Sequence, residues 1–534
     1  MESVIISDES RRANGAYYTP TSAADQMADW MVRYEGEHFV EPSFGDGIFL
    51  KAIREASDRR GFKETSIAGV ELDADAISRA FHYERCQDVQ VIEGDFLGVN
   101  PFEVDGVIGN PPYVRLRNLE DSARHKALVA SKSFTGKTME TSGSVWMPFV
   151  LHSMRFLRRG GRIAMVLPYD FTYVRYARPL WEALGGNFDS LKIVRTHERL
   201  FGDILQDVII LYADGFGGKT DTVRFQAFER VRDVVANAAV VDEDISLSEL
   251  ALADRPFLKA LLGSDLQAFL DQRVAQATVP GREIVRFNIG YVSGDKEFFH
   301  PSASDIERFD LPDRSLISTL AAGRTMRGAG LWTSALADRG VEKLYLPDPA
   351  RMTEGELSYT AEGVKRGVAN RYKCQVREPW YVVPGVRTPD VVLSVFSERP
   401  ILMVNDAELV ASNSLLCGYS LGASRDVIAA SWYTSLTLLQ CELEVHSLGG
   451  GVMVLVPGEA GNVRLPRQVA VQGDHPTQLN ALLAARRVNE AYELGDKEVL
   501  VRQLGFTAEE VDLVKQGVAT LTHWRTSARF SHKD

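Results

Sequence analysis

Seven short runs rich in β-branched and other apolar residues recur between residues 38 and 213, and segments with helical periodicity separate them. Ahead of the first run, Ala24, Met27, Ala28 and Met31 share one face of a helix, because their spacing is i, i+3, i+4, i+7. Strands that alternate with helices predict an α/β fold with a mainly parallel sheet. The expected strands are His38–Glu41, Ile67–Leu72, Val89–Ile92, Val104–Ile108, Arg162–Leu167, Leu191–Arg195 and Val208–Tyr212.

The pattern changes after the glycine-rich segment 215–218. Short strands and polar helices mix up to residue 280, and glycine-punctuated β-like runs dominate from residue 281 onward. We therefore expect a first domain over 1–215, a connecting region over 216–280, a second, mixed α/β domain over 281–470 and a helical segment over 471–534. The later β-like runs are Phe287–Val292, Val391–Phe396, Ile401–Val404 and Val452–Val456, and two closing helices are expected between Thr477 and Gly517.

Composition argues against two classes of protein. The chain lacks a run of about 20 apolar residues, so we expect no membrane-spanning helix. Residues 1–12 are polar and lack the apolar stretch of a secretory signal. The 4 cysteines show no metal-knuckle spacing. We expect a cytoplasmic protein in a reducing compartment, without a metal site.

The net charge of −12 argues weakly against a nucleic-acid partner, because phosphate contacts need Lys and Arg. Local charge decides binding more than the sum does. Residues 364–388 contain six basic residues and a single acidic one, Glu378. This cluster, which is either a solvated face or a phosphate-facing surface, consists of Lys365, Arg366, Arg371, Lys373, Arg377 and Arg387.

Acidic residues and glycines follow the first three expected strands. The first strand runs into a glycine-rich turn over 41–49, which lets a ligand approach the backbone closely. This turn is neither a GxGxxG fingerprint nor a P-loop. The second strand ends at Glu71, where a carboxylate can accept from ribose hydroxyls. The third strand ends at Asp95-Phe96. The carboxylate of Asp95 can accept a hydrogen bond from an adenine amine, and the ring of Phe96 can pack against the base. Three such strand ends in order predict a nucleoside site.

The fourth strand ends at Asn110-Pro111-Pro112-Tyr113, the strongest signal in the chain. Two prolines fix the backbone, so the Asn110 amide and the Pro111 carbonyl are held at the strand exit. Both oxygens are acceptors that suit the two hydrogens of a planar exocyclic amine. Such acceptors favour the positive charge that the nitrogen gains on attack. Tyr113 adds a face on which a base can stack.

Asn-Pro-Pro-Tyr in this setting resembles amino-group methyltransferases that use S-adenosylmethionine (AdoMet). The whole series is similar to gamma-class, TaqI-like DNA adenine-N6 methyltransferases, closely over residues 11–215 and more loosely beyond. The resemblance implies a Rossmann-like sheet of seven strands, mostly parallel with one antiparallel strand late in the order. It also implies that residues 1–215 form the catalytic domain and residues 281–470 the target-recognition domain.

The resemblance also implies roles for single residues. Glu41 stands where Asp is commoner in the family. A target adenine flipped out of the duplex would stack between Tyr113 and Phe201. The implied catalytic residues are Asn110, Pro111, Pro112 and Tyr113, and Lys365, Arg366, Arg371, Lys373 and Arg377 are the expected DNA contacts. The implied AdoMet contacts are Tyr17, Thr19, Glu41, Pro42, Gly45, Gly47, Glu71, Leu72, Asp95, Phe96 and Phe149.

The implied substrate is double-stranded DNA, and the implied role is protection of host DNA in a restriction–modification system, with a separately encoded restriction endonuclease as a candidate partner. Two alternatives use the same tetrapeptide, namely adenine methylation in RNA and methylation of the glutamine amide of release factors. Those enzymes are shorter and lack a long C-terminal region. A further alternative is a catalytically inactive DNA-binding protein of a phage-defence system, against which the intact motifs argue. We find no carboxylate–lysine cluster in the sequence that would indicate a fused nuclease.

Overall fold

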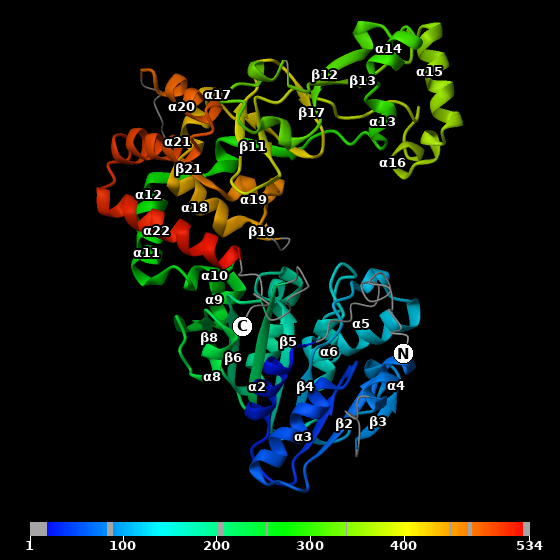
Figure 1. Ribbon diagram of the computed structural model, residues 1–534, viewed down its shortest axis with the longest axis vertical. Helices are drawn as coiled ribbons and strands as arrows, with labels where there is room; N and C mark the ends of the chain where they lie inside the picture. Colours follow the sequence, from blue (N-terminus) through cyan, green and yellow to red (C-terminus); the bar gives the residue numbers. More distant parts are fainter. Residues whose placement is uncertain are drawn as a thin grey trace. The chain divides into compact units, whose positions relative to one another are not determined.

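The computed structural model describes residues 19–82, 89–199, 207–252, 255–337, 339–447, 451–467 and 473–526. They form two compact units, one ending at Leu261 and the other spanning Leu262–Thr526, coloured from blue to green and from green to red in Figure 1. Two expected site residues, Tyr17 and Phe201, lie outside the described residues. Within those residues, no helix has both the length and the apolar character needed to cross a membrane.

The first unit is built on one sheet with the strand order β3-β2-β1-β4-β5-β7-β6-β8-β9. Neighbours are parallel from β3 to β5, and β7 runs antiparallel to both β5 and β6. β8 is parallel to β6, and β9 is antiparallel to β8. The strands are β1 His38–Glu41, β2 Ser66–Glu71, β3 Gln90–Glu93, β4 Val104–Gly109, β5 Leu157–Pro168, β6 Phe188–Thr196, β7 Val208–Phe216, β8 Thr222–Phe228 and β9 Val241–Ser246.

All seven strands expected from the sequence are present, and the late antiparallel strand is β7. The sheet nevertheless has nine strands, because β8 and β9 extend it beyond residue 215. In β8, Val223, Phe225 and Ala227 are buried at every second position, and Phe225 pairs with Ile193 of β6. The first compact unit continues to Leu261, beyond the expected domain boundary at 215, and it includes most of the expected connecting region 216–280.

Helices pack on the sheet through the apolar faces that the sequence shows. In α2, the predicted stripe of Ala24, Met27, Ala28 and Met31 is fully buried, in one core cluster with residues of α3 and of seven strands. Packing against β5 and β6 comes from α6 and α7. The helices of this unit are α2 Thr21–Met31, α3 Ile48–Arg60, α4 Ala74–His82, α5 Asp121–Thr135, α6 Trp146–Ser153, α7 Arg178–Gly185, α8 Val231–Val235, α9 Leu247–Leu252 and α10 Pro256–Ala260.

The second unit holds four small sheets, ordered β11-β18-β14-β16, β13-β12-β17, β15-β20-β19 and β10-β21. Its strands are β10 Thr278–Pro280, β11 Val285–Ile289, β12 Leu316–Leu320, β13 Glu342–Tyr345, β14 Val391–Ser394, β15 Phe396–Ser397, β16 Leu402–Val404, β17 Val410–Ala411, β18 Leu415–Ser420, β19 His446–Ser447, β20 Met453–Val454 and β21 Arg464–Pro466. Its helices are α11 Gly263–Phe269, α12 Ala275–Ala277, α13 Lys296–Phe299, α14 Ala303–Arg308, α15 Glu354–Lys365, α16 Tyr372–Gln375, α17 Arg425–Trp432, α18 Ser435–Glu444, α19 Pro457–Asn462, α20 His475–Ala484, α21 Val488–Gly495 and α22 Ala508–Arg525.

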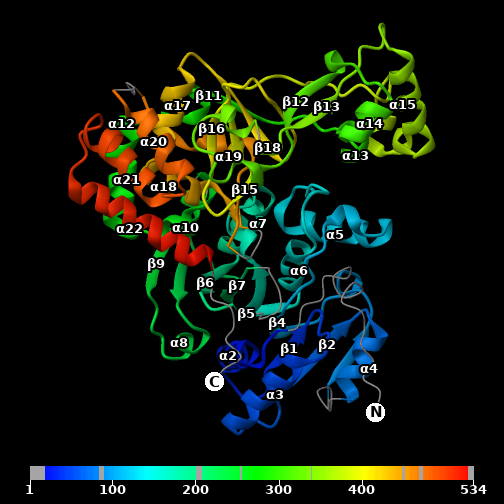
Figure 2. The ribbon, with the colours of Figure 1, turned by 45° about the horizontal axis from the view of Figure 1, so that its top comes forward.

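Three helices, α20, α21 and α22, close the second unit, where the sequence suggested two. They are part of this unit rather than a separate segment, since α22 lies along α18 (Figure 2). A buried ion pair joins the two helices, with 2.7 Å between Arg525 Nε and Glu442 Oε2. Thr522 Oγ1 donates to the other oxygen of the same carboxylate at 2.7 Å. The mixed α/β character and the four predicted β runs of this unit are confirmed.

One part of the second unit has a core of its own. We call residues 291–386 the α13–α16 lobe, because these helices and strands β12 and β13 surround a shared aromatic cluster (Figure 1). At its centre, the rings of Phe298 and Tyr359 stack with centroids 4.7 Å apart. The Tyr359 hydroxyl donates to the Phe298 carbonyl oxygen at 2.6 Å, so the buried phenol is satisfied. Apart from Arg387, this lobe carries the basic cluster that the sequence singled out.

Candidate active site at the carboxyl edge of the first sheet

The expected site residues follow neighbouring parallel strands. β1 pairs with β2 on one side and with β4 on the other, so the chain order reverses at β1. Ligands of open α/β sheets bind outside the carboxyl ends of the strands at such a switch point. The turn after β1, Glu71 at the end of β2 and Asn110 after β4 all lie at this edge. The topology therefore brings together the strand ends that the sequence selected one by one.

The glycine-rich turn after β1 is bonded to the end of β2. Glu71 Oε2 accepts from the Gly45 amide at 2.8 Å, and Oε1 accepts from the amides of Leu72 and Asp73 at 2.8 and 2.9 Å. Gly45 and Gly47 have φ values of 54° and 80°, in the left-handed region that favours glycine, and Gly47 precedes the first turn of α3. The carboxylate is thus fixed by backbone donors, and Oε2, which accepts only one of them, keeps a lone pair for a further donor.

Glu41, the last residue of β1, is a buried acid with unused bonding capacity. Its side chain is 1% exposed, and Oε2 has no hydrogen-bond partner among the described residues. Burial, followed by the nearby charges of Asp46 and Glu71, raises the pKa of Glu41 well above its usual value. A cationic group at this edge would find an acceptor that the protein itself leaves unfilled. The carboxyl is therefore suited to a ligand that carries positive charge.

Asp95 begins the short 3-10 helix η1 (Phe96–Gly98) after β3. Its Oδ1 accepts from the Leu97 amide at 3.1 Å, and its Oδ2 pairs with Lys126 Nζ of α5 at 3.0 Å. No local sequence pattern indicates Lys126, which lies 31 residues away from Asp95. The side chains of Asp95 and Lys126 are 21% and 44% exposed, so the carboxylate is fixed yet remains open to a ligand.

The expected walls of the cofactor pocket separate into two groups. Leu72 is 72% exposed, an apolar side chain that a ligand could cover. Phe96 and Phe149, in contrast, are 1% and 7% exposed, and their ring centroids lie 5.3 Å apart in a buried aromatic cluster. Pro42 is also buried, and the absence of a side chain at Gly109 lets it pack there. Leu72 is thus available to a ligand in this structure, while the two phenylalanine rings belong to the core.

Asn110 is held from several directions. Its Nδ2 donates to Thr19 Oγ1 at 3.3 Å, and Ser43 Oγ donates to its backbone carbonyl oxygen at 3.2 Å. The Tyr113 hydroxyl donates to Asn110 Oδ1 at 2.8 Å and also lies 3.1 Å from the Val166 carbonyl oxygen of β5. Thr19, expected to contact AdoMet, therefore contacts Asn110, the expected catalytic residue. The sequence could not show this, because the two residues are 91 positions apart.

The basic cluster of the α13–α16 lobe is only partly free. Arg377 donates to the carbonyl oxygens of Val292 and Ser293 at 2.5 and 2.7 Å, and burial lowers its pKa, so it serves the lobe itself. Arg371 pairs with the buried Asp295 at 2.8 Å, and Arg366 pairs with an exposed Glu297 at 3.2 Å.

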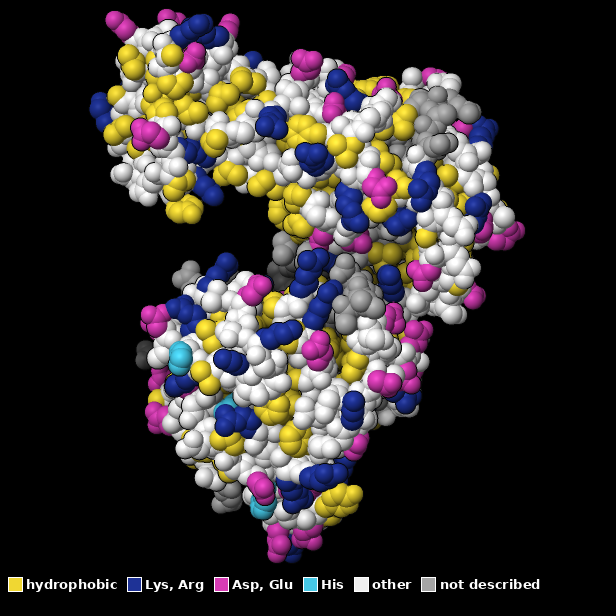
Figure 3. All heavy atoms as spheres, turned by 180° about the vertical axis from the view of Figure 1, so that it is seen from behind, with side chains coloured by type: hydrophobic (Ala, Val, Ile, Leu, Met, Phe, Trp, Pro, Cys, Tyr) yellow, Lys and Arg dark blue, Asp and Glu magenta, His cyan; other side chains and the backbone are white. Residues whose placement is uncertain are grey.

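Lys365 and Lys373 are exposed, and the structure gives neither an acidic partner within the described residues. Tyr372 and Val376 are close to Lys373 in the chain, and they are 72% and 68% exposed. Hydrophobic side chains lie among charged ones on the surface of this lobe, at the upper left of Figure 3. Cationic and aromatic side chains are therefore accessible together there.

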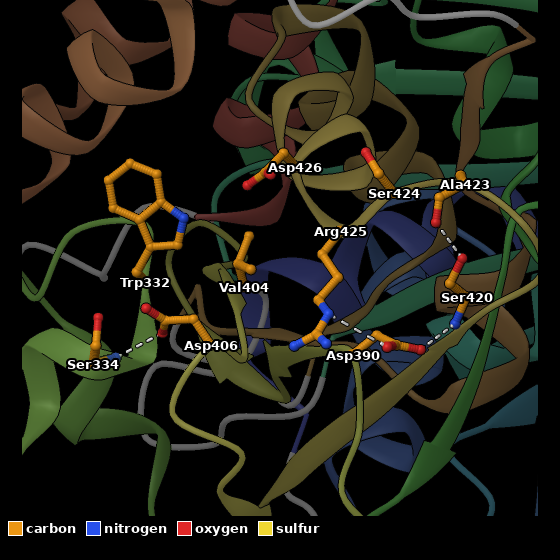
Figure 4. A pocket seen from close by; sticks show the side chains of 10 residues that line it. All are labelled: Trp332, Ser334, Asp390, Val404, Asp406, Ser420, Ala423, Ser424, Arg425 and Asp426. Carbon is orange, nitrogen blue, oxygen red and sulfur yellow. Dashed lines mark hydrogen bonds and ion pairs between the residues drawn. The ribbon is translucent and has the colours of Figure 1, made fainter.

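A second hollow lies within the second unit, between β14, β16, β18 and the start of α17 (Figure 4). It holds about 560 Å³. Two of the acids that line it already serve the fold, since Asp390 accepts from the Ser420 amide at 2.8 Å and Asp406 accepts from the Ser334 amide at 2.8 Å. Arg425 Nε lies 3.6 Å from Asp390. The sequence could not reveal this hollow, because its lining comes from separate segments.

Comparison with known proteins gives two family matches. A model described as Eco57I restriction-modification methylase matches residues 63–201, and one described as the C-terminal domain of type II methyltransferase M.Eco57I matches residues 254–500. Both models describe methyltransferases, which is the class of enzyme that the sequence resembles. Together they span more than two thirds of the chain, which over both stretches is similar to type II restriction-modification methyltransferases of the Eco57I kind.

Single relatives are more distant. Type II methyltransferase M.BstVI of Geobacillus stearothermophilus is 27% identical over 234 residues, which cover 36% of this chain and 40% of that protein. M.PaeR7I of Pseudomonas aeruginosa is 26% identical over 452 residues, 74% of each chain. The solved structure of the type IIG restriction endonuclease BpuSI is 13% identical with a TM-score of 0.45, covering 97% of this chain and 67% of that one. The chain spans about two fifths of the length of M.BstVI and of M.HincII from Haemophilus influenzae.

Proposed function

We propose that the chain is a site-specific DNA methyltransferase that transfers a methyl group from AdoMet to N6 of adenine in duplex DNA. The observation that carries this proposal is the fixed Asn110-Pro111-Pro112-Tyr113 turn beside the sheet's switch point, with the Asn110 carboxamide bonded to Thr19 and Tyr113. The family matches support a DNA methyltransferase. The choice of adenine N6 rests on the resemblance and on the chemistry of the turn.

The residues at the edge fit AdoMet. Glu71 would accept from the ribose hydroxyls, and Asp95 from the adenine amine, since each carboxylate is fixed and keeps an acceptor position. Leu72 is exposed and would cover one face of the adenine. The unfilled Oε2 of Glu41 suits the positive charge that AdoMet carries. AdoMet supplies the methyl group, and the protein supplies position and electrostatics.

The turn acts on the target amine. Asn110 Oδ1 and the Pro111 carbonyl oxygen would each accept one hydrogen of the exocyclic amine. Two acceptors draw the planar nitrogen toward a tetrahedral geometry and stabilise the positive charge that develops as it attacks. The prolines fix the backbone that carries both oxygens before the base arrives, so little backbone reorganisation is needed during the reaction. Pro112 contributes through this rigidity.

The target adenine must leave the duplex, because its N6 is paired and lies in the major groove. Extrusion costs a few kcal/mol, which a pocket recovers by stacking and hydrogen bonds. Tyr113 would provide one face of that pocket. Phe201 would provide the other, although it lies outside the described residues.

The second unit would make the contacts with DNA outside the pocket. Lys365 and Lys373 would neutralise phosphates, and the exposed ring of Tyr372 lies between them in sequence. Residues 281–470 would set the recognition sequence, and methylation of host DNA would protect it from a separately encoded endonuclease. We assign Arg377 to the lobe's own structure rather than to DNA, because its guanidinium is already bonded to two carbonyl oxygens.

Expression in a host that lacks adenine methylation tests the proposal. Single-molecule sequencing of the host DNA should reveal N6-methyladenine in one sequence context, and cells that express Asn110→Ala should show none. Marks on cytosine N4, or on RNA alone, would refute the assigned target. A host without any DNA marks, despite a folded wild-type protein, would refute methyl transfer to DNA.

A further inference from the structure

Hydroxyl groups contact both ends of the Asn110 carboxamide. Nδ2 donates to Thr19 Oγ1 at 3.3 Å, and Oδ1 accepts from the Tyr113 hydroxyl at 2.8 Å. Thr19 is 7% exposed and precedes α2, whereas Tyr113 packs against the core cluster beneath the sheet edge. Both hydroxyls are thus carried by packed segments rather than by free loops, and each can hold the carboxamide in place.

The orientation of this carboxamide decides whether it can act. The terminal torsion of Asn is broad and roughly two-fold, so an unrestrained group exchanges the positions of its oxygen and nitrogen. The nitrogen has no lone pair to offer an amine, and only the oxygen is an acceptor. A flipped Asn110 would therefore turn two donors toward the target and lose the interaction on which the chemistry depends.

Tyr113 also has a second acceptor within reach. Its hydroxyl lies 3.1 Å from the Val166 carbonyl oxygen, and one hydrogen can serve only one acceptor at a time. When a target amine donates to Asn110 Oδ1, the hydroxyl can turn to Val166. It then keeps a hydrogen bond, so the base can take its place without leaving a buried donor unpaired.

We propose that Thr19 and the Tyr113 hydroxyl are positioning groups that hold Asn110 in its productive orientation. This inference rests on the proposed function, in which Asn110 acts on the target amine. It gives Tyr113 a role for its hydroxyl that is separate from stacking by its ring. It also moves Thr19 from cofactor binding to the support of the catalytic asparagine.

The test compares variants that change single atoms. Tyr113→Phe keeps the ring and removes the hydroxyl, Thr19→Val removes the acceptor at similar volume, and Thr19→Ser restores it. We measure the single-turnover methyl-transfer rate at saturating AdoMet on a duplex with the site that the wild-type chain methylates. The AdoMet dissociation constant is measured by calorimetry. Tyr34→Phe, at a side chain 69% exposed, is the matched control.

We expect Tyr113→Phe and Thr19→Val each to lower the single-turnover rate about three- to tenfold, the effect of one hydrogen bond. AdoMet affinity should stay within about twofold, Thr19→Ser should recover the rate, and Tyr34→Phe should match the wild type. A wild-type rate in Tyr113→Phe overturns the inference for that hydroxyl, whether or not Thr19→Val folds. A Thr19→Val defect confined to AdoMet affinity overturns it for Thr19. A wild-type chain that transfers no methyl group overturns the proposed function and this inference together.

Discussion

Replacing Asp95 by alanine should weaken AdoMet binding without unfolding the protein. The change removes the acceptor for the adenine amine, a charge-assisted hydrogen bond worth about 1.5–3 kcal/mol. At about 1.4 kcal/mol per tenfold change, the dissociation constant should rise by one to two orders of magnitude. The cost to stability is smaller. Asp95 caps only the three-residue η1, and its pair with Lys126 is partly exposed. We expect about 1–2 kcal/mol from the lost cap and ion pair.

Isothermal titration calorimetry measures the affinity, and thermal denaturation checks the fold. Asp73→Ala is the matched control, because that carboxylate is 52% exposed at the same edge and pairs only distantly with Arg79, at 3.9 Å. Its AdoMet affinity should equal that of the wild type. An Asp95→Ala protein that binds AdoMet with undiminished affinity would refute the assignment of the adenine subsite.

The remaining predictions concern stability, DNA binding and base flipping. Because burial raises the folded pKa of Glu41, stability from this group is present at low pH and falls as pH rises from about 4.5 toward the raised folded value. Denaturant titrations at several pH values should show this fall in the free energy of unfolding for the wild type and not for Glu41→Gln. The same pH dependence in both proteins would contradict the prediction. Replacing Lys365 and Lys373 together by alanine should weaken DNA binding and lower the slope of log affinity against log salt by about 2; an unchanged slope would remove them from the interface. 2-Aminopurine at the target position should brighten with the wild type and respond differently with Phe201→Ala, whereas a flat signal with an active wild type would argue against flipping.

Much of the first sheet could be predicted from its sequence. Strands such as Val104–Gly109 are short, apolar and bounded by turn residues, so their pattern alone indicates them. The bounds of β8 and β9 were not predicted, because polar residues interrupt the apolar pattern of both strands and β9 forms the edge of the sheet. β9 reads Val-Asp-Glu-Asp-Ile-Ser, a composition that usually indicates a loop. The pairing of β8 with β6 and of β9 with β8 became visible only in the fold.

The site was predictable where it follows strand ends and unpredictable where it depends on contacts across the chain. Glu71 and Asn110 could be chosen because turns after parallel strands share one edge. The contact of Asn110 with Thr19 and that of Asp95 with Lys126 have no counterpart in local sequence. Likewise, composition counted Arg377 among the DNA contacts, although its guanidinium is bonded within the lobe.

The central claim is that Asn110 and its neighbours drive methyl transfer to adenine N6. Purified protein, AdoMet labelled in its methyl group and duplex DNA from an unmethylated host can be incubated and digested to nucleosides, which mass spectrometry then identifies. We predict labelled N6-methyladenine as the sole methylated nucleoside with the wild type. We predict none with Asn110→Ala, although that variant should still bind AdoMet. Label on another nucleoside, or undiminished N6-methyladenine from Asn110→Ala, would contradict it.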